Sequence, residues 1–278
     1  MKVKPLNKKI LKLFFSKISL FLGIITGILV FIDLSKKCRL LMISILFFIA
    51  LLYYLKLLIC ANVKNKVKIN YGGSVIEIRE GDILKEFDND DSFRVFAFNE
   101  YFDTEVDDKI IAEKTLNGKI LKYLNGTDEI NHRMEEDSNL NENIKNKNVK
   151  RKYGKKTQYN LGTIFKYKNM FFTAMTHFDN QNRAYLSIQD YIRFLINFWD
   201  EINKYYANKT VVIPLLGSGI TRIDNYSYSD EQILKLILLT FKIRRIKFKM
   251  PAKLVILLDS HTNKRINYFT LEDDFNGL

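Results

Sequence analysis

Residues that commonly form disulfides, metal centres and nucleotide-hydrolysing loops are scarce in this sequence of 278 residues. It has two cysteines, neither of them beyond Cys60, so no disulfide can cross-link the rest of the chain. Three histidines (His132, His177 and His261) lack the spacing of a metal-ligand set, and no Gly-Lys-Ser or Gly-Lys-Thr loop is present. These absences exclude a disulfide scaffold and a P-loop, and we expect no metal site.

Acidic residues are almost absent from the first 68 residues, and this decides how the net charge of +13 is interpreted. That stretch holds thirteen lysines and arginines and a single acidic residue, Asp33, which gives it a net charge of +12. The rest of the chain holds 31 basic and 30 acidic residues, a net charge of +1. The excess of basic residues is therefore typical of a membrane-flanking segment, and we expect no nucleic-acid partner.

Two long apolar runs occupy the N-terminal part of the chain. Residues at about 13–33 and 40–60 are predominantly apolar, with Lys17 and Lys56 as the basic residues inside them. Crossing the hydrocarbon core takes about 20 apolar residues, and both runs reach that length if these lysines extend toward the headgroups. Neither run has a polar face at helical spacing, and no signal-peptide cleavage pattern separates them. We predict a transmembrane hairpin over residues 1–64.

Basic residues are unevenly divided between the ends and the turn of this hairpin. Six lie before the first span or near its start and four lie at the end of the second or after it, against three in the turn. The positive-inside rule then predicts a multi-pass membrane protein with both termini in the cytoplasm. Cys38 and Cys60 would lie at opposite faces of the bilayer and cannot pair. Gly23 and Gly27 have the spacing that lets membrane helices pack closely, so we expect a homo-oligomer, with chance as the alternative.

Residues 65–278 alternate between strand-like and helix-like patterns, which is typical of a single α/β domain. Several runs are apolar at nearly every position, as in strands buried on both faces of a sheet. A capping box at Ser229 and Gln232 predicts the start of one helix. The predicted strands are 74–78, 94–98, 163–167, 170–178, 210–216 and 254–258, and the predicted helices are 107–124, 185–206 and 229–246. We expect a mixed sheet flanked by helices.

A polar insertion interrupts this pattern at residues 127–158. Its first half is acidic and its second half is basic, with very little apolar content. Such a composition predicts a solvated, partly disordered loop. A lid over a binding site is the other possibility, without direct support from the sequence.

Glycines follow the apolar strand at residues 210–216. Gly217-Ser218-Gly219 comes directly after Pro214, and a new helix begins around Ser229. Glycines at such a point let the backbone approach a ligand, and their consecutive N–H groups can hold a phosphate. An ordinary strand-to-loop turn is the alternative. Two distant elements, Gly81-Asp82-Ile83 and Phe98-Asn99-Glu100, favour the binding loop.

Across about residues 70–278 these elements resemble a macro domain, the fold that binds ADP-ribose and its derivatives. Gly81-Asp82-Ile83 is similar to the family element whose aspartate receives the adenine amino group, and Asn99 lies where the family has an asparagine loop beside the distal ribose. The Gly217 loop is similar to the second phosphate loop of the family. The resemblance implies a macro-domain-like mixed sheet. The ligand-binding residues that it implies are Asp82, Ile83, Asn99, Glu100, Tyr101, Phe102, Asp103, Gly118, Lys119, Leu216, Gly217, Ser218, Gly219, Ile220, Thr221 and Arg222.

Two predicted spans, the run at 98–104 and Leu116-Asn117-Gly118-Lys119 together resemble a narrower group, the membrane-anchored macro effectors of type II Thoeris antiphage systems. In that family a partner protein with a TIR domain makes histidine–ADP-ribose on infection, and the membrane protein senses this signal and disrupts the membrane. The resemblance implies an antiviral defence effector that binds a small-molecule nucleotide signal, needs no cofactor and acts on the lipid bilayer.

The sequence departs from macro domains that hydrolyse ADP-ribosyl bonds. Phe102 takes the position of their second asparagine, and their polyglycine loop is reduced to residues 117–120. Because groups that hold the diphosphate and position a water are reduced, we expect a sensor without catalytic residues rather than an enzyme. Lys119 is expected to pair with a phosphate instead. A membrane-tethered ADP-ribosyl hydrolase and a ligand-less macro-like interaction module stay open as alternatives.

Overall fold

The computed structural model describes residues 2–29, 31, 35–179, 181–218, 222–224 and 228–276 of the chain. These divide into two compact units. One contains residues 1–65 together with 264–278, and the other contains residues 66–263.

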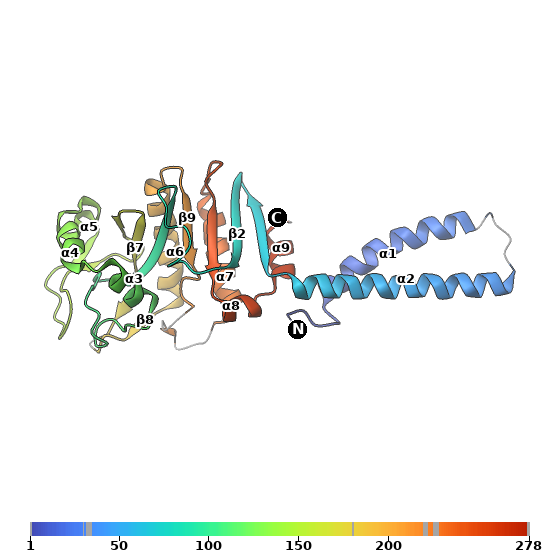
Figure 1. Cartoon of the computed structure of the whole chain (residues 1–278), viewed down its shortest axis with the longest axis horizontal. Coiled ribbons are helices and arrows are strands. Elements are labelled where there is room, and N and C mark those ends of the chain that lie inside the picture. The colour runs from blue at the N-terminus through green and yellow to red at the C-terminus, as the bar shows by residue number, and fades with distance from the viewer. Residues whose placement is uncertain are drawn as a thin grey trace. The chain divides into compact units, whose positions relative to one another are not determined.

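Two long helices form most of the first unit (Figure 1). They are α1 (Lys8–Leu29) and α2 (Lys36–Val63), and both are long and apolar enough to cross a membrane. Ser35 caps α2 by accepting a hydrogen bond from the backbone N–H of Cys38. Ala61 is the one buried residue of α2, and most of the large apolar side chains of this helix are exposed among the described residues. The predicted spans fall on these helices, although residues 30 and 32–34 lie outside the described part of the chain.

Helix α9 (Tyr268–Asn276) belongs to the same unit as the two long helices. Val3, Ile10 and Ala61 are buried in a small apolar cluster, and Phe269 of α9 packs against it. The side chain of Asn62 and the backbone of Val3 exchange two hydrogen bonds, which fix the segment before α1 to the end of α2. Two ion pairs connect α9 to the hairpin: Lys9–Asp274 and Lys64–Glu272.

A mixed sheet forms the centre of the second unit (Figure 1). In the described residues its strands follow the order β1-β2-β11-β9-β3-β7-β8-β10, and β6 also pairs with β7. The five central strands β2, β11, β9, β3 and β7 are parallel to one another, whereas β1, β6 and β8 run antiparallel to their neighbours. The strands are β1 (Lys66–Tyr71), β2 (Ser74–Glu80), β3 (Ser92–Asn99), β6 (Ile164–Tyr167), β7 (Met170–Phe178), β8 (Ala184–Leu186), β9 (Thr210–Pro214), β10 (Arg222–Ile223) and β11 (Leu254–Leu258).

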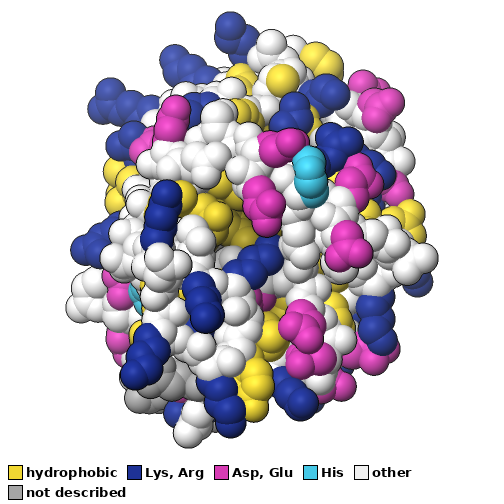
Figure 2. Space-filling model, turned by 90° about the vertical axis from the view of Figure 1, so that its left-hand side faces the viewer, with side chains coloured by type: hydrophobic (Ala, Val, Ile, Leu, Met, Phe, Trp, Pro, Cys, Tyr) yellow, Lys and Arg dark blue, Asp and Glu magenta, His cyan; other side chains and the backbone are white. Residues whose placement is uncertain are grey.

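Side chains on both faces of this sheet are buried, as the apolar runs predict. Phe96 and Phe172 belong to a cluster with residues of helices on one face, and the alternate residues Val95 and Phe171 are equally buried. The main helices are α3 (Leu116–Leu124), α6 (Ile188–Tyr205) and α7 (Asp230–Arg244), and a short α8 (Ser260–Arg265) follows β11. The predicted capping box of α7 is confirmed. Figure 2 shows one face of the molecule, where Lys and Arg side chains are interspersed with Asp and Glu rather than gathered into a single basic patch.

The helix predicted over residues 107–124 is wrong in its first half. Only α3, from Leu116 onward, is helical. The Asp107 carboxylate accepts hydrogen bonds from the N–H groups of Lys109 and Ile110, and Asp108 has a φ of 60°. These local hydrogen bonds compete with those of a helix. The apolar residues that have helical spacing in this segment are therefore buried residues of a turn. The helix predicted from residue 185 likewise begins only at Ile188, because residues 184–186 form β8.

The prediction that residues 127–158 form a solvated loop is also wrong. The segment contains helices α4 (Thr127–Glu136) and α5 (Ser138–Glu142), and β4 (Ile144–Asn146) pairs with β5 (Gln158–Tyr159). Three of its few apolar side chains pack on the core. Ile130, Met134 and Leu140 are buried in the cluster that contains Phe172. Because the apolar content of this segment is low, its sequence did not indicate that it is folded.

Candidate functional site

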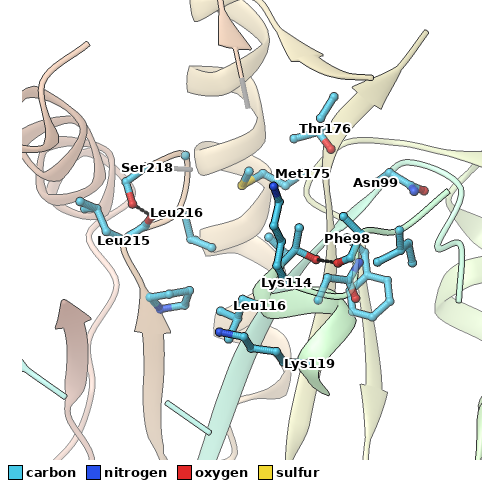
Figure 3. Close-up of a pocket in the computed structure, with 18 of the residues that line it drawn as sticks. Phe98, Asn99, Lys114, Leu116, Lys119, Met175, Thr176, Leu215, Leu216 and Ser218 are labelled. Atoms are coloured by element: carbon cyan, nitrogen blue, oxygen red, sulfur yellow. Dashed lines mark hydrogen bonds between the residues drawn. The ribbon is translucent and has the colours of Figure 1, made fainter. Parts of the chain in front are cut away.

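A large pocket opens at the carboxyl ends of the five parallel strands (Figure 3). Its volume is about 1540 Å³. In an open α/β sheet this end of the strands is the usual place for a ligand. Residues that line the pocket come from the ends of all five strands, among them Asp82 after β2, Asp259 after β11, Leu216 after β9, Asn99 of β3 and Phe178 of β7.

The sheet order sets the length of the pocket. From β2 to β7 there are four interstrand spacings of about 4.8 Å, so the strand ends extend over about 19 Å. Asp82 lies at the β2 end, the loop after β9 lies in the middle, and Asn99 lies toward the β7 end. Such a site fits an extended ligand with different chemical groups along its length.

The loop after β9 is held tightly against helix α6. The Tyr191 hydroxyl donates to the Leu216 carbonyl oxygen at 2.6 Å, and the Ser218 hydroxyl donates to the Leu215 carbonyl oxygen at 2.8 Å. Burial raises the pKa of the Tyr191 phenol above its ordinary range, so the phenol stays a donor. Gly217 has a φ of 92°, and an added Cβ would lie 3.0 Å from the Tyr191 ring. Glycine is therefore required here both by conformation and by space.

Part of this predicted loop cannot be placed. Gly219, Ile220 and Thr221 lie outside the described residues, and Arg222 is described only through its backbone in β10. The described portion, Leu216 to Ser218, lines the pocket.

The start of helix α3 borders the middle of the pocket. Thr115 caps the helix by accepting a hydrogen bond from the N–H of Gly118. Lys114 and Lys119 line the pocket, and Figure 3 shows Lys114 between Leu216 and Phe98. Two cations and the positive end of a helix favour an anionic group here. Gly118 itself is buried. An added Cβ there would lie 2.4 Å from the Ala112 carbonyl oxygen.

Asp82 stands at the β2 end of the pocket in a short turn. Its carboxylate accepts a hydrogen bond from the N–H of Leu84 at 3.0 Å and lies 3.8 Å from the ammonium of Lys85. About half of the side chain is exposed, so the carboxylate keeps acceptor capacity for a ligand. Ile83, which is almost fully buried, lines the pocket beside it.

The loop after β3 divides the predicted site residues into two groups. Asn99 lines the pocket, whereas Glu100, Tyr101, Phe102 and Asp103 are buried and do not border the cavity. Phe102 packs in the apolar cluster. The Glu100 carboxylate lies 2.7 Å from Nδ1 of His177, and the Gln158 amide donates to it. These four residues form a layer behind the pocket wall, so ligand contacts by them stay a prediction.

Several pocket residues carry no signal in the sequence. Thr176, Asp179, Asn182 and Arg183 come from the end of β7 and the turn before β8, which only tertiary pairing defines. The backbone N–H of Arg183 lowers the pKa of Asp179, with a further contribution from the Arg183 guanidinium at 2.8 Å. Asp179 is therefore charged at neutral pH.

The described pocket lining contains carboxylates, lysines and amide groups. It includes no histidine or cysteine among the residues that the structure places there. Within the described part of the chain, no group of three His, Cys, Asp or Glu side chains could hold a metal ion. Its charged groups are spread along the length of the cavity, with acidic residues at both ends and lysines at the middle.

Comparison with known proteins gives a family. Residues 76–259 match the family described as Thoeris protein ThsA, Macro domain. The chain is 42% identical over 253 residues to the Thoeris protein ThsA of Bacillus amyloliquefaciens (strain Y2), covering 89% of this chain and 84% of that protein. Two structures of an Oceanobacillus iheyensis macrodomain are also similar. The one with ADP has a TM-score of 0.43 and 14% identity, covering 77% of this chain and 98% of that one. The one with MES bound has a TM-score of 0.42 and 15% identity, with the same coverage.

Proposed function

The chain belongs to the family of Thoeris ThsA macro-domain proteins, and from this premise we propose that it is a membrane-anchored antiviral sensor and effector. Its macro domain binds an ADP-ribose-derived signal, with histidine–ADP-ribose as the expected ligand. A TIR-domain protein supplies that signal. Ligand binding then drives association of several chains and disruption of the bacterial inner membrane, with the macro domain on the cytoplasmic side.

The observation that carries the binding proposal is the order of three elements along the sheet. Asp82 follows β2, the Gly217 loop follows β9, and Asn99 ends β3. Their order across the sheet is the order of adenine, diphosphate and distal ribose along ADP-ribose. The length of about 19 Å at the strand ends supports an extended dinucleotide-like ligand over a compact one.

Charge at the middle of the pocket supports the placement of the diphosphate there. Lys114 and Lys119 stand at the start of α3, opposite the backbone of the Gly217 loop. Lysine binds phosphate as a point charge and does not need the fixed geometry of an arginine fork. These two lysines take the place of the longer glycine loop that hydrolytic macro domains carry.

Binding without hydrolysis is the preferred form of the proposal. Phe102 takes the position at which hydrolytic macro domains carry an asparagine. Its ring is 1% exposed and lies within the apolar cluster. A buried phenyl ring cannot hold or polarise a water molecule. This supports a sensor over a membrane-tethered hydrolase.

The apolar helices support the membrane part of the proposal. Helix α2 is buried at Ala61 alone, and lysines flank both helices, as expected for segments that meet lipid. In the described residues nothing outside the helix's own nearby backbone lies within 4 Å of a Cβ added at Gly23 or Gly27 of α1, so this face has no packing partner among them. A second chain can pack against it.

Calorimetry on the full chain in lipid nanodiscs tests the binding proposal. We expect the wild type to bind ADP-ribose and histidine–ADP-ribose. Asp82→Ala removes a hydrogen bond to the adenine, which is worth about 1–3 kcal/mol, or about five- to 150-fold in affinity. The matched control is Asp90→Ala, an exposed carboxylate in the loop before β3 and so at the opposite end of the strands. Failure of the wild type to bind either compound rejects the function, and equal affinity of wild type and Asp82→Ala rejects the adenine position.

A further inference from the structure

A buried carboxylate organises the layer behind the pocket wall. Asp103 is 1% exposed and accepts three hydrogen bonds: from Nδ2 of Asn99 at 3.1 Å, from the guanidinium of Arg151 at 2.9 Å, and from the N–H of Lys155 at 2.7 Å. Two of these donors come from the insertion, some fifty residues further along the chain. Gly154 closes the turn directly over this carboxylate, since an added Cβ would lie 2.5 Å from Asp103 Oδ1.

The Arg151 side chain is itself almost fully buried, at 5% exposure. Its guanidinium stacks over the Tyr101 ring at 3.9 Å from the centroid and donates to the Lys155 carbonyl oxygen at 2.9 Å. A further N–H group donates to Oδ1 of Asn182 at 2.8 Å. Only a planar side chain with several fixed donors can serve these partners together.

The two ends of this chain of contacts both reach the pocket. Asn99 and Asn182 line it, from the end of β3 and from the turn between β7 and β8. Asp103 fixes the Asn99 carboxamide at one end, and Arg151 fixes the Asn182 carboxamide at the other. A single arginine from the insertion thus helps to hold two amide groups at the β3–β7 end of the cavity, Asn182 directly and Asn99 through Asp103, while Asn99 Oδ1 also accepts a hydrogen bond from the N–H of Tyr101 at 2.9 Å.

We propose that Arg151 is a positioning residue that sets the binding geometry for the distal ribose and whatever group that ribose carries. This rests on the proposed function, because the orientation with adenine at Asp82 places the distal ribose at the β3–β7 end. The insertion is then part of the binding site without touching the ligand. Its effect is confined to one end of the pocket, since among the described residues the network contains none from β2, β11 or the loop after β9.

The test compares a ligand that has the distal ribose with one that lacks it. The variants are Arg151→Met, Arg151→Lys and the control Lys152→Met, whose exposed side chain lies next in the sequence and outside the network. We expect Arg151→Met to lower the affinity for ADP-ribose about tenfold or more, the loss expected from one or two mispositioned hydrogen bonds, and to leave ADP binding unchanged. Lys152→Met should bind both compounds as the wild type does.

Folding is followed separately through Trp199, the single tryptophan, which is buried in the same domain. Removing one partner of a buried ion pair is costly, so Arg151→Met is at risk of unfolding. If it unfolds, Arg151→Lys decides, because lysine can still pair with Asp103 but cannot also reach Asn182 and stack on Tyr101. It should bind ADP-ribose several-fold more weakly with an unchanged unfolding midpoint.

The outcomes separate the two proposals. A wild type that binds no ADP-ribose rejects the proposed function itself. A wild type that binds ADP-ribose, with Arg151→Lys unchanged or with equal losses for ADP and ADP-ribose, rejects the positioning role alone. If the wild type binds ADP-ribose but not ADP, the distal ribose already supplies the affinity. The loss of ADP-ribose affinity in Arg151→Lys then decides on its own whether Arg151 has the positioning role.

Discussion

Phe47 and Phe172 are the same residue type in the two units of the chain, and their surroundings are opposite. Phe47 in α2 is 71% exposed, whereas Phe172 in β7 is fully buried. The contrast extends to whole elements. Of the 28 residues of α2 only Ala61 is buried, while the first seven of the nine residues of β7 are all buried. Apolar composition alone therefore does not say whether a segment is buried within the described part of the chain, as β7 is, or mostly exposed there, as α2 is.

The sharpest way to test this contrast is to alter a surface that only another chain can use. Gly23→Leu combined with Gly27→Leu adds bulk to α1 where an added Cβ meets no atom of the same chain. We expect nucleotide binding to stay intact and dye leakage from liposomes, triggered by ADP-ribose or histidine–ADP-ribose, to fall to background, because close packing of spans is lost.

The control for this prediction is Ser44→Leu, which adds similar bulk to an exposed position of α2. It should leak as the wild type does. Leakage at full strength in the double glycine variant would show that the glycine face plays no part. A ligand that leaves the oligomer size unchanged would reject the coupling between binding and assembly, since a ligand shifts only equilibria between states that it binds differently.

The second prediction concerns the buried side of the contrast. Phe172→Ala removes a ring that stacks on Phe98 at 4.5 Å and contacts Phe165 and Tyr167, so it should destabilise the sheet domain by about 3–5 kcal/mol. For a domain of this size the unfolding midpoint, followed through Trp199 fluorescence, should fall by about 6–20 °C. Phe47→Ala is the matched variant and should leave that midpoint unchanged. A comparable shift in both variants would mean that the two units unfold as one.

The third and smallest effect tests a charge that is buried within the insertion. Burial lowers the pKa of Lys155 to about 8. The unfolded chain keeps a pKa of about 10.4, so between about pH 8 and 10.4 the unfolded state binds more protons than the folded state. The cost of burying the ammonium is then fully present below pH 8 and is relieved as the pH rises, by at most about 3 kcal/mol.

Lys155→Met removes this dependence while keeping the backbone N–H that Asp103 accepts from. The variant should be more stable than the wild type at pH 7, and its advantage should shrink toward pH 10. The control Lys156→Met alters an exposed neighbour and should show no such trend. The measurement is urea unfolding in detergent at a series of pH values. A pH-independent difference between Lys155→Met and wild type would place the ammonium in contact with solvent.

The sheet could be predicted from the sequence wherever a strand is apolar at nearly every position. The strands at 170–178 and 254–258 have the predicted bounds, because burial on both faces leaves an unambiguous pattern. The edge strand β1 was missed although Val67 and Ile69 alternate with Lys66 and Lys68. Its lysines resemble the membrane-flanking lysines that precede it. The short strands β8 and β10 have no pattern of their own and form only by pairing.

The site was predictable only in part, for physical reasons that differ between residues. Asp82 and the Gly217 loop carry local motifs, and both line the pocket. The contact between Asp103 and Arg151 joins residues 48 positions apart, and neither residue has a neighbouring pattern that specifies the other. A charge-rich insertion gives the same composition whether its charges meet solvent or a buried partner. Only the fold distinguishes the two.

The packing of α9 against the hairpin bears on the order in which the chain is made. A ribosome produces α1 and α2 first and completes the whole sheet domain before it reaches Tyr268. The pairs Lys9–Asp274 and Lys64–Glu272 join segments 265 and 208 residues apart, so they cannot form while the sheet domain is still being translated. Helices α1 and α2 are therefore complete well before their last packing partner is made. A chain that ended after β11 would contain every strand of the sheet but lack α9 and both of these ion pairs.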